Sequence, residues 1–88
     1  MSYKVEYTSR AVKQLKKMDR QIAAFIISYI ERNLVGCEDP RKLGKSLEGN
    51  LKDKWRYRVG AYRILAKLED YRVVIVIIEV GHRSDIYK

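Results

Sequence analysis

The clearest pattern in the chain is a strict alternation of basic and hydrophobic residues that leads up to Val59. The basic residues occupy every second position, at Lys52, Lys54, Arg56 and Arg58. The positions between them from 55 onward are hydrophobic, at Trp55, Tyr57 and Val59. Because successive side chains of a strand point to opposite faces of a sheet, this alternation predicts a strand that buries its aromatic side and presents its cations to solvent.

A tight turn is predicted directly after this strand. Gly60-Ala61 follows Val59, and glycine suits the first central position of a type II′ hairpin turn. That turn would set three pairs of residues opposite each other, namely Val59 with Tyr62, Arg58 with Arg63, and Lys54 with Lys67. Like charges directly opposite on one sheet face are destabilising. The hairpin therefore predicts a basic sheet face that binds an anionic partner.

The N-terminal part of the chain predicts one strand and two helices. Alternation from Tyr3 to Thr8 is typical of a half-buried strand. Thr8 or Ser9 can cap a helix that runs to about Met18, and Asp19 can cap a second helix from Gln21 to about Val35. The second helix has one hydrophobic stripe, made by Ile22, Phe25, Ile26, Tyr29, Ile30 and Leu34. Two helices with so short a break predict an antiparallel hairpin.

The C-terminal part predicts a three-stranded meander after a long connection. Residues 36–50 contain the single proline and three of the five glycines without a clear period. The three strands are expected at Lys54–Val59, Tyr62–Leu68 and Arg72–Val80. We therefore predict one α+β domain over residues 1–88, of order β-α-α-β-β-β, with the helical hairpin packed on one face of a small, mainly antiparallel four-stranded sheet. The other face would carry the cations Lys54, Arg56, Arg58, Arg63 and Lys67, beside Leu65, Val74 and Val76.

Charge and cysteine content narrow the functional classes. The net charge is +8, and residues 52–63 contain five cations and one acid, which favours nucleic acid, an acidic protein or an anionic membrane surface as partner. A membrane is disfavoured, because the longest apolar run, Val73 to Ile78, is far shorter than the ~20 residues of a spanning helix. The N-terminus also lacks a charged-then-apolar leader. With a single cysteine, Cys37, and one histidine, we expect no disulfide, no metal, no cofactor and a cytoplasmic location.

Three short motifs carry a resemblance to a known family. They are Trp55-Arg56-Tyr57-Arg58, Tyr62-Arg63, and the closing Gly81-His82-Arg83 followed by Tyr87. Together with the order of the elements, they make the whole chain similar to the RelE branch of the RelE/ParE toxin superfamily. The resemblance implies a bacterial or archaeal toxin of a type II toxin–antitoxin system. Such toxins cut mRNA in the ribosomal A site, and an acidic, partly disordered, RelB-like antitoxin holds them inactive.

The resemblance also implies roles for individual residues. Arg63 matches the strand arginine that holds the scissile phosphate, and Arg83 matches an arginine near the leaving 5′-oxygen. Tyr87 matches a C-terminal tyrosine assigned to stacking on a base or to proton transfer. The expected catalytic set is therefore Arg56, Arg58, Arg63, Arg83 and Tyr87. This set fits cleavage through the 2′-hydroxyl, which needs in-line geometry and cations around the phosphorus.

The sequence departs from the best-known members in one respect, since arginines replace the lysines of the strand at 56 and 58. Arginine stays protonated and is a poor base, so the proton acceptor would be Tyr87, Lys54, Lys52 or His82. We assign RNA binding to Lys52, Lys54 and His82, and to Lys13 and Lys17 on the first helix, whose simpler interpretation is a solvated helix face. The competing functions are a ParE-like poison of DNA gyrase, a non-catalytic nucleic-acid-binding module and an inactive toxin homologue.

Overall fold

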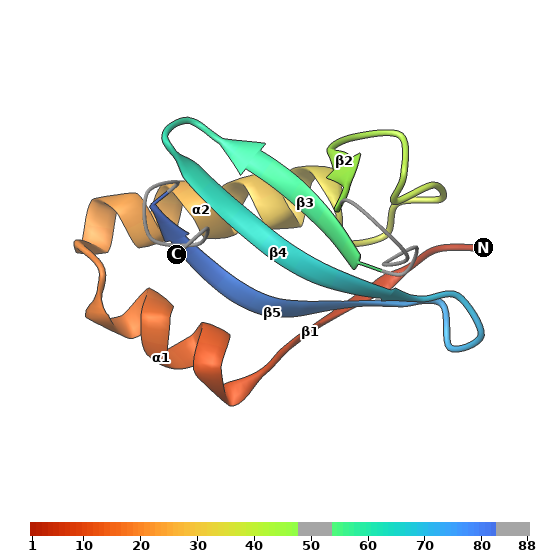
Figure 1. Ribbon diagram of the computed structural model, residues 1–88, viewed down its shortest axis with the longest axis horizontal. Helices are drawn as coiled ribbons and strands as arrows, with labels where there is room; N and C mark the ends of the chain where they lie inside the picture. The colour runs from red at the N-terminus through yellow and green to blue at the C-terminus, as the bar shows by residue number, and fades with distance from the viewer. Residues whose placement is uncertain (48–53, 83–88) are drawn as a thin grey trace.

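The computed structural model describes residues 1–47 and 54–82, which form a mixed sheet with two helices (Figure 1). In chain order the elements are β1 (Lys4–Tyr7), α1 (Ser9–Lys17), α2 (Arg20–Asn33), β2 (Lys45–Ser46), β3 (Lys54–Val59), β4 (Tyr62–Glu69) and β5 (Val74–His82). The strands lie side by side in the order β1-β5-β4-β3-β2. None of the helices in these described ranges is long and apolar enough to cross a membrane.

Both helices begin at the caps predicted from the sequence. The hydroxyl of Thr8 accepts a hydrogen bond from the backbone N–H of Ala11, and the carboxylate of Asp19 accepts from the N–H groups of Gln21 and Ile22. These bonds satisfy donors that the first turn of a helix leaves without an intrahelical partner. Phe25 differs from the predicted stripe of α2, because it lies beside Gly60 at the hairpin tip and is 60% exposed.

The sheet has five strands where four were predicted. Lys45 and Ser46 pair antiparallel with Arg56 and Trp55, inside the segment that the sequence indicated only as a connection. A strand of two residues is too short to produce a recognisable alternation, so the hydrophobic pattern did not predict it. The other pairings agree with a mainly antiparallel sheet, since β3, β4 and β5 form a meander and β1 alone runs parallel to its neighbour, β5.

The predicted hairpin between β3 and β4 is confirmed in turn type and register. Gly60 has a φ of +60° and Ala61 has no positive φ, as a type II′ turn requires. The three pairs predicted to face each other do so, namely Val59 with Tyr62, Arg58 with Arg63, and Lys54 with Lys67. The alternation of the two strands therefore divides their side chains between a helix-covered face and an open face.

The helices cover one face of the sheet, and α2 passes behind the strands in Figure 1. The core on this side joins Ile26 and Ile30 of α2 to buried residues of three strands, which include Tyr57, Ile64, Ile75, Ile77 and Val80. The first helix instead lies along β5 beyond the end of β1, where the Gln14 side chain accepts a hydrogen bond from the N–H of Val80 at 2.7 Å. Neither α1 nor α2, the two helices of the described residues, covers the opposite face of the sheet.

Candidate functional site

The basic hairpin face is the part of the open sheet face that carries Arg56, Arg58 and Arg63. Val59 and Tyr62 close the two-residue turn, so Arg58 and Arg63 form the next pair, which exchanges no backbone hydrogen bonds. Residues in such a pair have Cα atoms only about 4.5 Å apart, closer than in a hydrogen-bonded pair. Arg58 is exposed and Arg56 is partly exposed. The hairpin therefore presents a dense group of guanidinium groups on one surface.

Arg63 is buried, which corrects the expectation that the cations of this face point into solvent. It is 7% exposed, and it lies on a central strand between Arg58 of β3 and Gly81 of β5. Its Nε–H has no hydrogen-bond partner within the described part of the chain. A buried polar group without a partner is costly, and such groups are rare in folded proteins. An anion that reached this guanidinium would relieve that cost.

The acidic side chains of the open face, Glu6, Glu69 and Glu79, are engaged in ion pairs. Arg72 pairs with Glu6 at 3.1 Å and also with Glu69, while Arg10 pairs with Glu79 at 2.9 Å. The hydrogen bonds from Arg72 hold the pKa of Glu69 below its usual value. Neither Arg58 nor Arg63 makes an ion pair with a described residue. Arg58 and Arg63 therefore place two positive charges without a described ion pair next to each other beside the turn.

A cavity of about 350 Å³ lies at the outer edge of β3, and we call it the edge pocket. Its lining residues come from α2, from the connection before β2, and from β2 and β3, and are Tyr29, Leu43, Gly44, Lys45, Arg56 and Arg58. Three of these side chains are cationic. No pattern in the sequence indicated Lys45, which lies in a segment without a period, and Tyr29 was predicted only as part of the helix stripe.

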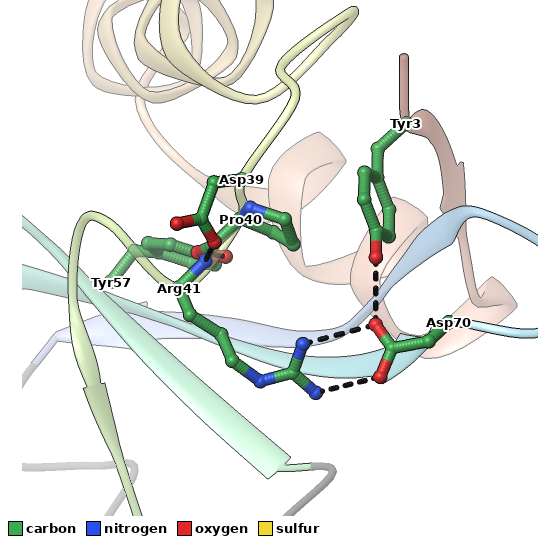
Figure 2. A network of polar contacts seen from close by, with 6 residues as sticks. All are labelled: Tyr3, Asp39, Pro40, Arg41, Tyr57 and Asp70. Carbon is green, nitrogen blue, oxygen red and sulfur yellow. Dashed lines mark hydrogen bonds and ion pairs between the residues drawn. The ribbon is translucent and has the colours of Figure 1, made fainter. Parts of the chain in front are cut away.

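A polar network holds the connection that forms one wall of the edge pocket (Figure 2). The Arg41 guanidinium donates to both carboxylate oxygens of Asp70 at 3.0 Å, and the hydroxyl of Tyr3 donates to the same carboxylate at 2.7 Å. Arg41 comes from the connection, Tyr3 from the start of the chain and Asp70 from the turn before β5. The bonds from Arg41, followed by that from Tyr3, hold the pKa of Asp70 below its usual value.

Two aromatic residues of β3 fasten the same connection to the sheet. The hydroxyl of Tyr57 donates to the carbonyl of Pro40 at 2.6 Å, and the indole N–H of Trp55 donates to the carbonyl of Leu43 at 2.6 Å. The Arg41 guanidinium also lies 5.9 Å from the centre of the Trp55 ring, within cation–π range. Trp55 is only partly buried, where the sequence predicted a core residue, because it faces this connection. Burial raises the pKa of Tyr57, so its hydroxyl stays protonated.

The structure places the remaining predicted site residues at three different locations. Lys54 lies opposite Lys67 at the far end of the hairpin. His82 pairs with Tyr62 on the helix-covered side, where the two rings meet edge to face with centroids 5.5 Å apart, so the pleat does not place it beside Arg63. Lys13 and Lys17 are exposed on α1, which packs along β5 and so lies across the sheet from β3.

The other predicted site residues, Lys52, Arg83 and Tyr87, fall outside the described residues, so their predicted roles stay predictions. Within residues 1–47 and 54–82, no group of three or more histidine, cysteine, aspartate or glutamate side chains gathers into a possible metal site. The chemistry that the described site offers is therefore that of closely spaced cations beside a pocket with an aromatic wall.

Comparison with known proteins places this architecture in a family. A sequence model described as the ParE toxin of the type II toxin–antitoxin system parDE matches residues 5–87. The toxin RelG of Mycobacterium tuberculosis is 33% identical over 88 residues, which cover 100% of this chain and 99% of that protein.

Solved structures agree with the sequence comparison. The toxin–antitoxin complex RelBE2 of Mycobacterium tuberculosis contains a chain with a TM-score of 0.82 and 30% identity, covering 97% of this chain and 95% of that one. A mutant of the Escherichia coli toxin RelE in the free state has the same fold, with a TM-score of 0.78, 24% identity, and coverage of 98% of this chain and 90% of that one. The chain therefore belongs to the RelE/ParE superfamily of toxins from type II toxin–antitoxin systems.

Proposed function

We propose that this toxin is a ribosome-dependent endoribonuclease that cuts mRNA in the ribosomal A site. The observation that carries the proposal is the Arg58–Arg63 pair on the open sheet face, with the buried Arg63 Nε–H unpartnered in the described part of the chain. A planar guanidinium matches the geometry of two phosphate oxygens, and clustered arginines suit a phosphate whose charge increases during the reaction.

In the proposed reaction, the 2′-hydroxyl of the mRNA loses its proton and attacks its own phosphate, and the bond from phosphorus to the 5′-oxygen of the next nucleotide breaks. The leaving oxygen takes up a proton, so the products are a 2′,3′-cyclic phosphate and a 5′-hydroxyl. Arg63 holds the scissile phosphate, while Arg58 and Arg56 stabilise the additional negative charge on it. The resemblance adds Arg83 near the leaving oxygen and Tyr87 near the substrate base. His82 lies on the helix-covered side and Lys54 lies at the far end of the hairpin from Arg63, so we propose Tyr87 or Lys52 as the group that accepts the proton.

The toxin also needs a partner that keeps it inactive. The chain in the RelBE2 complex, which this protein resembles over nearly its whole length, comes from a toxin–antitoxin assembly. With a net charge of +8 and the Arg58–Arg63 pair beside the turn, we propose an acidic RelB-like antitoxin that covers the basic hairpin face. Both the ribosome and mRNA as targets imply a cytoplasmic location.

One alternative receives support from the comparisons, because the matching family model carries the ParE name. A ParE-like protein would poison DNA gyrase by binding and would have no use for a phosphate-holding arginine. The similar proteins RelG and the RelBE2 toxin favour the RelE branch instead. A non-catalytic nucleic-acid-binding module would share the basic face but would not depend on the position of any single cation.

The variant Arg63→Gln separates these functions. An enzyme that uses Arg63 at the scissile phosphate should lose about 100-fold or more in its single-turnover cleavage rate on ribosomes, because removal of one preorganised transition-state donor has costs of this order. Its affinity for ribosomes should fall much less. The control Arg32→Gln removes the same charge from the exposed end of α2 and should cut like the wild type. Equal cleavage by Arg63→Gln and wild type would refute the assigned role.

A further inference from the structure

The lining of the edge pocket offers two kinds of contact. Lys45, Arg56 and Arg58 supply positive charge from two adjacent strands, and Tyr29 and Leu43 supply an aromatic ring and an aliphatic side chain. Lys45 and Arg58 are both exposed, and neither makes an ion pair with a described residue. A ligand that fits both kinds of contact has an anionic group and a flat, stackable group within a few ångströms of each other.

The pocket is built into the fold, because its outer wall packs directly against the backbone of β3. Gly44 has a φ of +76°, and a Cβ atom at this position would lie 2.3 Å from the carbonyl oxygen of Arg56. The Trp55 indole and the Arg41–Asp70 pair hold the connection before Gly44, and the pairing of Lys45 with Arg56 holds the residue after it. A preformed cavity binds its ligand without a large ordering cost.

Arg58 connects the edge pocket to the proposed cleavage site. Its side chain lines the pocket, and its cross-strand neighbour is Arg63. A phosphate held by Arg63 would therefore lie next to Arg58, which lines the pocket. The separation of neighbouring side chains across strands is about 5 Å, which is comparable to a single nucleotide step along an RNA chain.

We propose that the edge pocket binds one nucleotide of the RNA substrate, next to the scissile phosphate. This inference rests on the proposed function. The nucleotide's phosphate lies between Lys45 and Arg58, and its base packs on Tyr29 and Leu43, as single-stranded RNA does when bases stack on aromatic side chains. The cavity volume, about 350 Å³, lies at the low end of the range for small-molecule sites and suits one nucleotide. An acidic peptide would use the cations but leave the Tyr29 ring without a stacking partner.

The first experiment titrates the free toxin with adenosine 5′-monophosphate, uridine 5′-monophosphate and inorganic phosphate, and follows backbone and Tyr29 ring signals by NMR. We expect both nucleotides to shift Tyr29, Gly44 and Lys45, and to bind more tightly than phosphate. Tyr29→Leu should weaken nucleotide binding at least about fivefold, because one stacking contact has at least this effect. Lys45→Gln should also weaken it, because this change removes a cation from the phosphate. Lys4→Gln, which removes an exposed lysine from β1 at the other edge of the sheet, should bind like the wild type.

The second experiment compares single-turnover cleavage on ribosomes for mRNAs that differ only in the nucleotide beside the cut. Tyr29→Leu should reduce the discrimination between these mRNAs while Arg63-dependent cleavage persists. If the wild type does not cut but nucleotides still shift the pocket residues, the proposed function fails and the pocket remains a nucleotide site. Nucleotide shifts elsewhere on the protein would overturn the inference, and so would variants that lose only antitoxin binding.

Discussion

Arg58 and Arg63 form a cross-strand pair of like charges, which is unfavourable for the stability of a sheet. Two guanidinium groups lie opposite each other, and one of them is buried with an unpartnered Nε–H in the described part of the chain. Packing alone would favour an acid or an apolar residue at either position. In the proposed function, an anionic substrate would resolve the conflict, because its phosphate would contact both groups at once. The cost in stability is thus a property of the free toxin.

The ion pair of Asp70 with Arg41 predicts how the free energy of unfolding depends on pH. Because hydrogen bonds in the folded state hold its pKa below the ordinary value of 3.8, its contribution to folding is complete above that pH. The contribution is then lost as the pH falls through the lower folded-state pKa. We expect Asp70→Asn to be less stable than the wild type at pH 7, with the difference shrinking below pH ~4.

Urea unfolding at pH 7 and at pH 3 measures this difference in the free energy of unfolding. Glu38→Gln removes an exposed carboxylate from the same connection and controls for the change in net charge. If the difference in the free energy of unfolding between wild type and Asp70→Asn stays constant from pH 7 to pH 3, the carboxylate of Asp70 does not stabilise the fold through Arg41.

At the level of elements, local signals predicted what local interactions determine. The caps at Thr8 and Asp19 and the hairpin at Gly60 depend on neighbouring residues, and each was predicted. The connection before β3 was not, because partners distant in sequence hold it, as with Arg41 on Asp70. The edge pocket and β2 depend on that connection, so half of the candidate site could not be read from periodicity. The burial of Arg63 was missed for a similar reason, since it depends on neighbours in two other strands.

Gly44→Ala tests whether the connection packs on β3 as described. A Cβ atom at residue 44 would meet the Arg56 carbonyl oxygen at 2.3 Å, in addition to the strain of a positive φ, which is about 1–3 kcal/mol for a non-glycine residue. Gly36→Ala is the matched control, because its φ is +79° but nothing lies within 4 Å of the added atom. We expect Gly44→Ala to lower the melting temperature clearly more than Gly36→Ala. Equal shifts would mean that the close approach to β3 does not exist in solution.

At the scale of the whole molecule, the fold divides its two sheet faces between stability and function. The helix-covered face holds the core, whereas on the open face the acids are engaged in ion pairs and the arginines Arg56, Arg58 and Arg63 lie on β3 and β4. This arrangement leaves one broad basic surface that can bind an anionic partner on a chain of 88 residues. Both an acidic antitoxin and mRNA fit it by charge, and their competition for one surface would explain how the antitoxin inactivates the toxin.

Cleavage of A-site mRNA can be tested by adding purified toxin to ribosomes that carry an mRNA with an empty A site, and by mapping the ends of the products. We predict a cut inside the A-site codon that leaves a 2′,3′-cyclic phosphate, that requires ribosomes, and that disappears when the nucleotide at the cut carries a 2′-deoxy sugar. Intact mRNA after incubation with freshly released, folded toxin would contradict the claim. Gyrase inhibition by the same preparation would then identify the protein as a binding poison.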